Sequence, residues 1–165
     1  MAPLSEVKTG LVIRKADIDD VPSMIKLGME MHEESPVFNM VDFDGDKLMS
    51  LAKSGAMTDF GASFLAEING EAIGMFCGII VPHYWGHMLM ANDLCLFVTK
   101  SRRGGTAAYR LIKAFEAWAI ANGAVALRFG ISTNIEPERT LKLYEKLGYK
   151  LEGYQVNKYY QGGSK

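Results

Sequence analysis

The dipeptide Asn69-Gly70, which lies between two apolar runs, constrains the fold of this chain more than any other sequence feature. Asn-Gly favours the two-residue turn of a β-hairpin, so residues 63–81 are predicted to form two antiparallel strands. The apolar run 88–98 predicts a further strand, which follows the aromatic loop HYWGH. The early part of the sheet is therefore expected to be antiparallel.

Strands alternate with helices in the second half of the chain, which implies parallel neighbours there. The helix that follows residues 88–98 has an apolar stripe formed by Ala108, Leu111, Ile112, Phe115 and Trp118. The predicted elements are a helix from the glycines after Arg103 to Asn122-Gly123, a strand over 124–132, a helix from Pro137 to Gly148, and two short strands over 149–160.

The first sixty residues predict a strand over 11–16, a helix that Asp17 caps and that ends near Glu33, and a short helix around Leu48. The predicted order is therefore β-α-α-β-β-β-α-β-α-β-β. This order indicates an α/β fold of the α+β type, with a mixed central sheet of about seven strands and helices on both faces.

The length of 165 residues is typical of a single domain, which we expect to span 1–165 with flexible ends at 1–10 and 161–165. The net charge of −1 argues against a general attraction to nucleic acid or to an anionic membrane. No apolar run approaches the ~20 residues of a membrane-spanning helix, and the N-terminus lacks the apolar core of a signal peptide. We therefore expect a cytoplasmic protein.

Several metal-like patterns are incomplete, so no metal site is predicted. The segment DFDGD, 42–46, has its glycine one place too early for a calcium loop and no closing glutamate, and it reads better as a helix cap. His83 and His87 are four residues apart but lack a third ligand. Cys77 and Cys95 lie in apolar runs without metal spacing, which favours buried reduced thiols over a disulfide or a catalytic cysteine.

The stretch RRGGTA, 102–107, joins the end of a predicted strand to the start of a predicted helix. The first N–H groups of a helix have no partner within it, and the glycines allow a ligand to approach them closely. Such a helix start binds phosphate readily. The stretch fits neither a Walker loop nor a G-x-G-x-x-G dinucleotide fingerprint. Taken alone, it is equally compatible with a capping turn that carries solvated arginines.

Three segments together resemble the GCN5-related N-acetyltransferase (GNAT) family. The loop RRGGTA fits that family's R/Q-x-x-G-x-G/A motif, although Ala107 replaces the commoner last glycine and Arg110 stands where leucine is usual. Residues 13–27 resemble the opening strand and helix, and residues 133–153, which contain LYEKLGY, resemble the closing segment. The resemblance covers nearly the whole chain, and the loop followed by LYEKLGY at this separation is specific.

The resemblance implies a fold and a cofactor site. In a GNAT-like sheet, strands four and five splay apart to hold acetyl-CoA, with the pantetheine along the open strand edge and the pyrophosphate at the loop. No metal is implied. The implied cofactor-binding residues are Leu96, Phe97, Val98, Arg102, Arg103, Gly104, Gly105, Thr106, Ala107 and Asn134.

The resemblance also implies an acyltransferase, which moves an acetyl group from acetyl-CoA directly to a primary amine of a small molecule, protein or peptide. Tyr144 matches the tyrosine that protonates the CoA sulfur, although it could be only a core aromatic. Asp93 is the candidate base, unless it merely bonds a neighbouring backbone group; His83 and His87 are alternatives. The candidate acceptor-binding residues are Glu30, Glu33, His83, Tyr84 and Trp85.

Two other classes of function compete with this interpretation. One is a non-catalytic acyl-CoA-binding regulatory module of the same fold, because the base is not settled. The other is a nucleic-acid-binding protein that uses the basic residues near the loop, which the near-neutral total charge disfavours. The sequence identifies neither the acceptor nor the acyl chain length, and it leaves a homodimer open.

Overall fold

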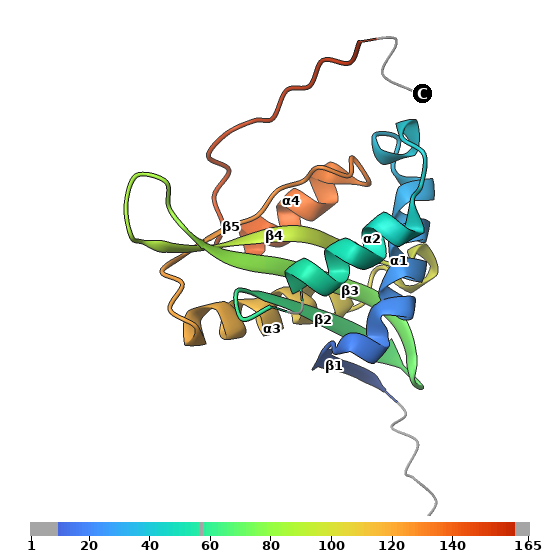
Figure 1. Cartoon of the computed structure of the whole chain (residues 1–165). Helices are drawn as coiled ribbons and strands as arrows, with labels where there is room; N and C mark the ends of the chain where they lie inside the picture. The colour runs from blue at the N-terminus through green and yellow to red at the C-terminus, as the bar shows by residue number, and fades with distance from the viewer. Residues whose placement is uncertain (1–9, 57, 161–165) are drawn as a thin grey trace, which may run out of the picture. The chain divides into compact units, whose positions relative to one another are not determined.

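The computed structural model describes residues 10–56 and 58–160, and Figure 1 shows their arrangement along the chain. Within these residues, five strands form one sheet in the order β1-β2-β3-β4-β5. They are β1 (Leu11–Lys15), β2 (Gly61–Ile68), β3 (Glu71–Pro82), β4 (Leu89–Val98) and β5 (Ala126–Arg128). The neighbours from β1 to β4 are antiparallel, whereas β4 and β5 are parallel. The predicted mixed sheet is confirmed.

The predicted number of about seven strands is wrong, because the described residues contain five. The two short strands expected over 149–160 do not form in the described part of the chain, where residues 150–160 are exposed. A pair of short strands is stable only when an apolar face packs against something else, and these residues bury no such face. Apart from Gly10, the ends predicted to be flexible lie outside the described residues.

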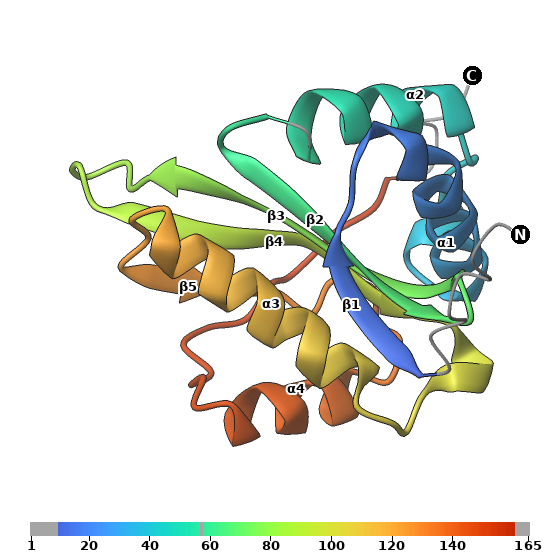
Figure 2. The same ribbon diagram turned by 90° about the horizontal axis from the view of Figure 1, so that it is seen from below.

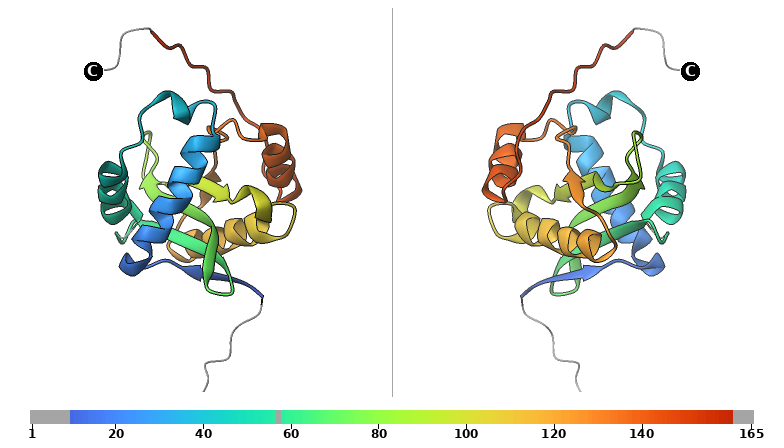
Figure 3. Two further views of the ribbon diagram at one scale, coloured as in Figure 1. Left: turned by 90° about the vertical axis from the view of Figure 1, so that its right-hand side faces the viewer. Right: turned by 90° about the vertical axis from the view of Figure 1, so that its left-hand side faces the viewer.

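Helices cover both faces of the sheet, as predicted. The described α-helices before Ile135 are α1 (Val21–Glu34), α2 (Gly45–Leu51) and α3 (Ala107–Ala121), and α4 (Pro137–Lys146) follows them in the chain. Figures 2 and 3 show α1 and α3 on opposite faces, where α1 contacts β3 and β4 and α3 contacts β1 to β4. The described residues up to Ile135 form one compact unit, and those from Glu136 on, which include α4, form another. A single domain over the whole chain stays a prediction.

Local signals in the sequence determine where several elements begin and end. Asn69 and Gly70 have φ values of 53° and 80°, as the tight turn between β2 and β3 requires. Asp44 accepts a hydrogen bond from the N–H of Lys47 at 2.9 Å and caps α2, so the predicted cap is confirmed. Gly123, with a φ of 88°, follows the end of α3.

The two faces of β3 pack against different helical layers. Met75 and Cys77 face α1 and share a buried cluster with Met24 of that helix. Phe76 lies on the opposite face, where its ring stacks on that of Phe115 in α3 at 4.5 Å between centroids. Because successive side chains of a strand alternate between faces, β3 joins both helical layers into one core.

Candidate functional site

The parallel pairing of β4 and β5 is short. It runs from the pair Met90–Ala126 to the pair Asn92–Arg128, and β4 continues beyond it to Val98. The chain after Arg128 is not in a strand. The implied separation of strands four and five is therefore confirmed, and we call this opening the fork.

The register of β4 decides which backbone groups its open edge presents. The N–H of Thr99 donates to the C=O of Ile73 at 2.8 Å, so the backbone groups of Val98 point away from β3. Because this direction alternates from residue to residue, the backbone groups of Leu96 also point away from β3, whereas those of Phe97 bond to β3. The side chain of Phe97 is 4% exposed and belongs to the core. Of the three residues predicted to contact the cofactor here, two present backbone groups to the fork.

A β-bulge interrupts β4 beside the fork, a feature that the sequence did not predict. Gly78 pairs with Asp93 and Cys77 pairs with Cys95, so Leu94 is an extra residue on β4. Its side chain is 55% exposed. Bulges redirect side chains and are frequent near active sites. A Leu within an apolar run gives no sequence signal for such a bulge.

The turn between β4 and α3 has an open backbone. Gly104 has a φ of 95°, a conformation that favours glycine, and a Cβ added to Gly105 would meet no heavy atom within 4 Å. Thr106 precedes α3 without a side-chain capping bond, and its C=O accepts the first helical bond from Arg110 at 2.9 Å. The N–H groups of the first turn, which begins at Ala107, thus lack partners within the helix. This geometry suits an anionic ligand.

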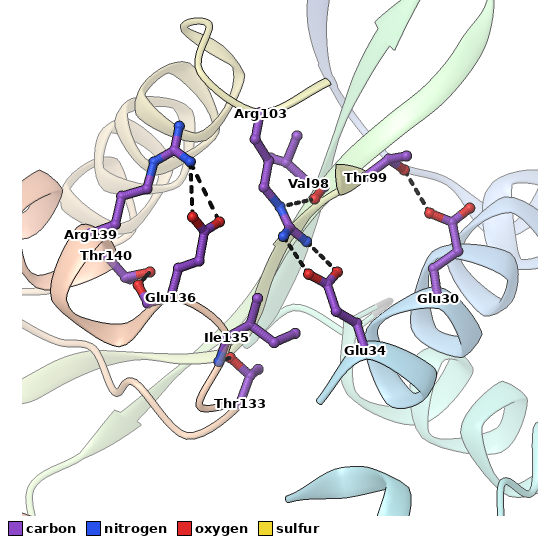
Figure 4. A network of polar contacts seen from close by, with 10 residues as sticks. All are labelled: Glu30, Glu34, Val98, Thr99, Arg103, Thr133, Ile135, Glu136, Arg139 and Thr140. Atoms are coloured by element: carbon purple, nitrogen blue, oxygen red, sulfur yellow. Dashed lines mark hydrogen bonds and ion pairs between the residues drawn. The ribbon is translucent and has the colours of Figure 1, made fainter. Parts of the chain in front are cut away.

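Arg103 folds back onto the fork instead of extending into solvent (Figure 4). Its Nε donates to the C=O of Val98 at 2.8 Å, and its Nη1 and Nη2 donate to the carboxylate of Glu34 at 2.5 and 2.6 Å. The guanidinium also lies 5.3 Å from the ring centroid of Phe97. Arg103 holds the pKa of Glu34 below its usual value, because it hydrogen-bonds the charged carboxylate. Arg102, by contrast, is exposed.

A groove of about 430 Å³ lies where the end of α1 meets the end of β4. It brings together Glu30 and Glu33, predicted for the acceptor, and Phe97, predicted for the cofactor. The Oγ1 of Thr99 donates to Glu30 at 2.7 Å (Figure 4). The groove is lined by Glu30, Glu33, Glu34, Phe97, Thr99, Lys100 and Ser101.

Asp93 lies at the base of the fork, directly after the last β4–β5 pair. Its Oδ1 accepts a hydrogen bond from the N–H of Gly130 at 2.8 Å, in the segment that follows β5. Burial raises the pKa of the Asp93 carboxyl to about 6, and its backbone hydrogen bonds offset this only in part. Asp93 therefore does bond a neighbouring backbone group, and it also titrates near neutrality as a base requires.

The aromatic loop lies at the tip of the β3–β4 hairpin, which projects from the sheet (Figure 1). Tyr84 and Trp85 are 80% and 82% exposed, and the ring of His83 stacks on Tyr84 at 4.7 Å. The hairpin pair next to the tip includes Leu89, at the opposite end of β4 from Val98, or about 30 Å along the strand. The structure therefore separates these three predicted residues from Glu30 and Glu33.

The two remaining predicted residues, Asn134 and Tyr144, belong to different units. Asn134, the last predicted cofactor residue, is exposed and has a φ of 53°. In the second unit, Glu136 pairs with Arg139 at 3.2 Å (Figure 4). Tyr144, the predicted acid, is 4% exposed, and its ring centroid lies 5.6 Å from that of Tyr149. Burial of this kind is compatible with both roles considered for Tyr144.

The described part of the chain has neither a metal-binding cluster nor a membrane-spanning helix. Among residues 10–56 and 58–160, no three or more His, Cys, Asp or Glu side chains are grouped so that they could hold a metal ion. In the same residues, none of the helices combines the length and the apolar character that crossing a bilayer would need.

Comparisons with known proteins agree with this architecture. Residues 29–149 match the Acetyltransferase (GNAT) family. No curated protein matches the chain.

Similar solved structures include several acetyltransferases. The aminoglycoside acetyltransferase AAC(6')-Iy, in complex with the bisubstrate analogue CoA-S-monomethyl-acetylneamine, is 22% identical, with a TM-score of 0.73 over 93% of this chain and 99% of that one. An aminoglycoside acetyltransferase from an uncultured soil metagenomic sample is 20% identical, with a TM-score of 0.71 and coverages of 93% and 100%. The ribosomal-protein-alanine N-acetyltransferase of Brucella melitensis biovar Abortus 2308 is 15% identical, with a TM-score of 0.71 and coverages of 92% and 99%.

At these identities the likeness to solved structures concerns the fold alone, whereas the family match spans well over half of the sequence. The chain belongs to the GNAT family of acetyltransferases.

Proposed function

We propose that this protein is an acetyl-CoA-dependent N-acetyltransferase, which transfers the acetyl group directly to a primary amine in a ternary complex. The observation that carries the proposal is the continuity of the open edge of β4 with the uncapped start of α3. An open strand edge and free helix N–H groups are both backbone features that need partners, and a ligand with amides followed by phosphates would satisfy them in sequence.

The residues around the fork fit acetyl-CoA in three ways. Leu96 and Val98 offer backbone groups that could pair with the pantetheine amides, although the C=O of Val98 already accepts from Arg103. Gly104 and Gly105 leave room for phosphate oxygens at the start of α3. Arg103 would contribute through its backbone, because its side chain is engaged elsewhere.

We assign Asp93 as the base that accepts the proton of the amine, and Tyr144 as the acid that protonates the leaving thiolate. Acetyl-CoA supplies the activated thioester. Asp93 is well suited because a carboxyl with a pKa of about 6 is mostly ionised at neutral pH and still binds a proton appreciably. Tyr144 has the one hydroxyl proton that a general acid needs. Alignment of the amine with the thioester supplies much of the rate.

We propose a cationic primary amine as the acceptor, of the kind found in polyamines, aminoglycosides and lysine side chains. In the groove, Arg103 neutralises the charge of Glu34. The remaining charged side chains of its lining are the carboxylates of Glu30 and Glu33 and the ammonium of Lys100, which together carry a net negative charge. The exposed aromatic tip is too distant to contact a small acceptor bound there. A protein or peptide acceptor could contact both the groove and the aromatic tip, and such a substrate would use Trp85 for binding.

The test combines a binding assay with an acceptor screen. Saturating acetyl-CoA should raise the melting temperature, because a ligand that prefers the native state stabilises it. Thiol release should then depend on an added amine, with kanamycin, spermidine and a lysine-containing peptide as probes. A melting temperature that acetyl-CoA leaves unchanged would refute the cofactor. Binding without amine-dependent thiol release would favour the non-catalytic acyl-CoA-binding module.

A further inference from the structure

We propose that the last turn of α1 acts as a brace, which holds the two arms of the fork at the spacing that acetyl-CoA needs. The brace consists of Glu30, Glu34 and Ser35, and these are positioning residues that need not touch the ligand. The inference rests on the proposed function, and it concerns how that site is built.

The first arm of the fork is fastened to α1 at two points. Glu30 and Glu34 are one helical turn apart and lie on the same side of the helix. Glu30 accepts from Thr99 at 2.7 Å, and Glu34 accepts from Arg103 at 2.5 and 2.6 Å (Figure 4). Thr99 and Arg103 flank the single helical turn Lys100–Arg102. Both ends of the segment that leads from β4 to the glycines are therefore fixed to one rigid element.

Arg103 also links the brace to the open strand edge. Its Nε donates to the C=O of Val98, a group that points away from β3. The side chains of Arg103 and Glu34 are only 15% and 25% exposed, and the two parallel N–H···O bonds fix their relative orientation. One guanidinium thus sets the position of the last edge carbonyl relative to α1, immediately before the predicted phosphate turn.

The second arm is fastened by the residue that follows α1. Ser35 is fully buried, and its Oγ donates to the C=O of Thr133 at 2.6 Å. The same oxygen accepts from the N–H of Phe38 at 3.0 Å, which fixes the hydroxyl in place. Thr133 belongs to the segment after β5 and directly precedes Asn134. The end of α1 therefore bonds to both arms, and it can set the width of the opening between them.

A direct role for Arg103 makes the opposite prediction. If its guanidinium were meant to bind the pyrophosphate, Glu34 would compete with the ligand, and removal of the Glu34 charge would strengthen binding. If Glu34 positions Arg103 and the turn, removal of that charge should weaken binding. The sign of the change in affinity distinguishes the two roles.

The experiment compares Glu34→Gln with Glu71→Gln in the full chain. Glu71 forms an exposed ion pair with Lys26 of α1 at 3.7 Å, so it is a matched control outside the fork. Calorimetry should show acetyl-CoA binding to Glu34→Gln about tenfold more weakly than to wild type, the factor expected for one charge-assisted hydrogen bond. Glu71→Gln should bind as wild type does. Ser35→Ala should also weaken acetyl-CoA binding, because it removes the hydrogen bond between the end of α1 and the second arm.

Two readouts separate positioning from a loss of stability. A Glu34→Gln/Arg103→Gln double variant should bind no more weakly than Arg103→Gln alone, because the two residues act as one unit. In the ligand-free Glu34→Gln protein, hydrogen exchange should accelerate at the amides of residues 99–106 and stay unchanged in β2.

Each alternative result has a definite meaning. Wild-type affinity or tighter binding in Glu34→Gln would overturn the brace, and so would unchanged exchange over residues 99–106. A wild-type protein that does not bind acetyl-CoA would instead overturn the proposed function, whatever the variants show in hydrogen exchange.

Discussion

Replacement of Asp93 by Asn should stabilise the protein at neutral pH while it slows acetyl transfer. The fold raises the pKa of the Asp93 carboxyl from 3.8 to about 6, because burial penalises the charged form. A pKa shift of this size lowers the free energy of unfolding at neutral pH by roughly 3 kcal/mol. Because the carboxyl is partly exposed and solvent screens it, we reduce this cost to about 2 kcal/mol. The amide oxygen of Asn can still accept the N–H of Gly130, so the fork should keep its geometry.

The pH dependence follows from the direction of the pKa change. Between about pH 4 and pH 6 the folded protein binds the Asp93 proton more tightly than the unfolded chain does, so wild-type stability falls as the pH rises through this window. The Asn variant lacks this titration. The melting temperature of the Asn variant minus that of wild type should therefore increase between about pH 4.5 and pH 7.5. For a chain of this size, the increase should be about 2–4 °C for each kcal/mol of stability that wild type loses.

Melting curves at several pH values test this reasoning, with Asp59→Asn as the control because Asp59 is an exposed carboxylate. Thiol release by Asp93→Asn should fall by ~10²-fold or more if Asp93 is the base. Asp93→Ala should lose acetyl-CoA affinity as well, because the bond to Gly130 disappears. If the melting temperatures of wild type and Asp93→Asn differ by the same amount at every pH, the carboxyl is not desolvated and the argument fails.

Three further changes have distinct expected outcomes. Gly105→Asp should fold normally, because a Cβ there meets nothing within 4 Å, yet lose at least tenfold in acetyl-CoA affinity by calorimetry, because the carboxylate repels phosphate. Tyr144→Phe should bind acetyl-CoA normally and lower single-turnover thiol release ~10²-fold; normal release would remove Tyr144 from the mechanism. Gly78→Ala should destabilise the fold by about 1–3 kcal/mol in urea, because its Cβ would lie 2.4 Å from the ring of Phe115. Gly86→Ala, where a Cβ has open space, should leave the urea midpoint unchanged.

The sequence predicted correctly those local features, such as turns and helix caps, that depend on residues adjacent in the chain. The turn at Asn69-Gly70 and the cap at Asp44 follow from the conformational preferences of one or two residues, and both are confirmed. The position of the fork followed from the family resemblance and is also confirmed. The two strands expected over 149–160 failed, because alternating residues form a strand only where a partner covers them.

The contacts that shape the candidate site were beyond such reasoning. Arg103 and Glu34 are 69 positions apart, and nothing near either residue indicates that they meet. The family resemblance presented Arg103 as a cofactor-binding residue of the loop, whereas its side chain links β4 to α1. In the same way, the aromatic loop and Glu30 both looked suitable for the acceptor, and only the length of the hairpin shows that they are far apart.

The bulge at Leu94 makes β4 a strand of two halves whose side chains alternate out of phase. Asp93 and Leu96 are an odd number of residues apart, yet both lie opposite residues of β3 that face α3. Deletion of Leu94 would remove the bulge and leave Asp93, Leu96 and Phe97 on the sheet faces that they now occupy. If Leu94 were kept and the pairing made regular, either Asp93 or Phe97 would have to exchange sheet faces. The bulge therefore lets β4 carry one residue more than β3 does opposite it, and Leu94 can be removed without a change of face, as residues of the hairpin tip beyond Pro82 can.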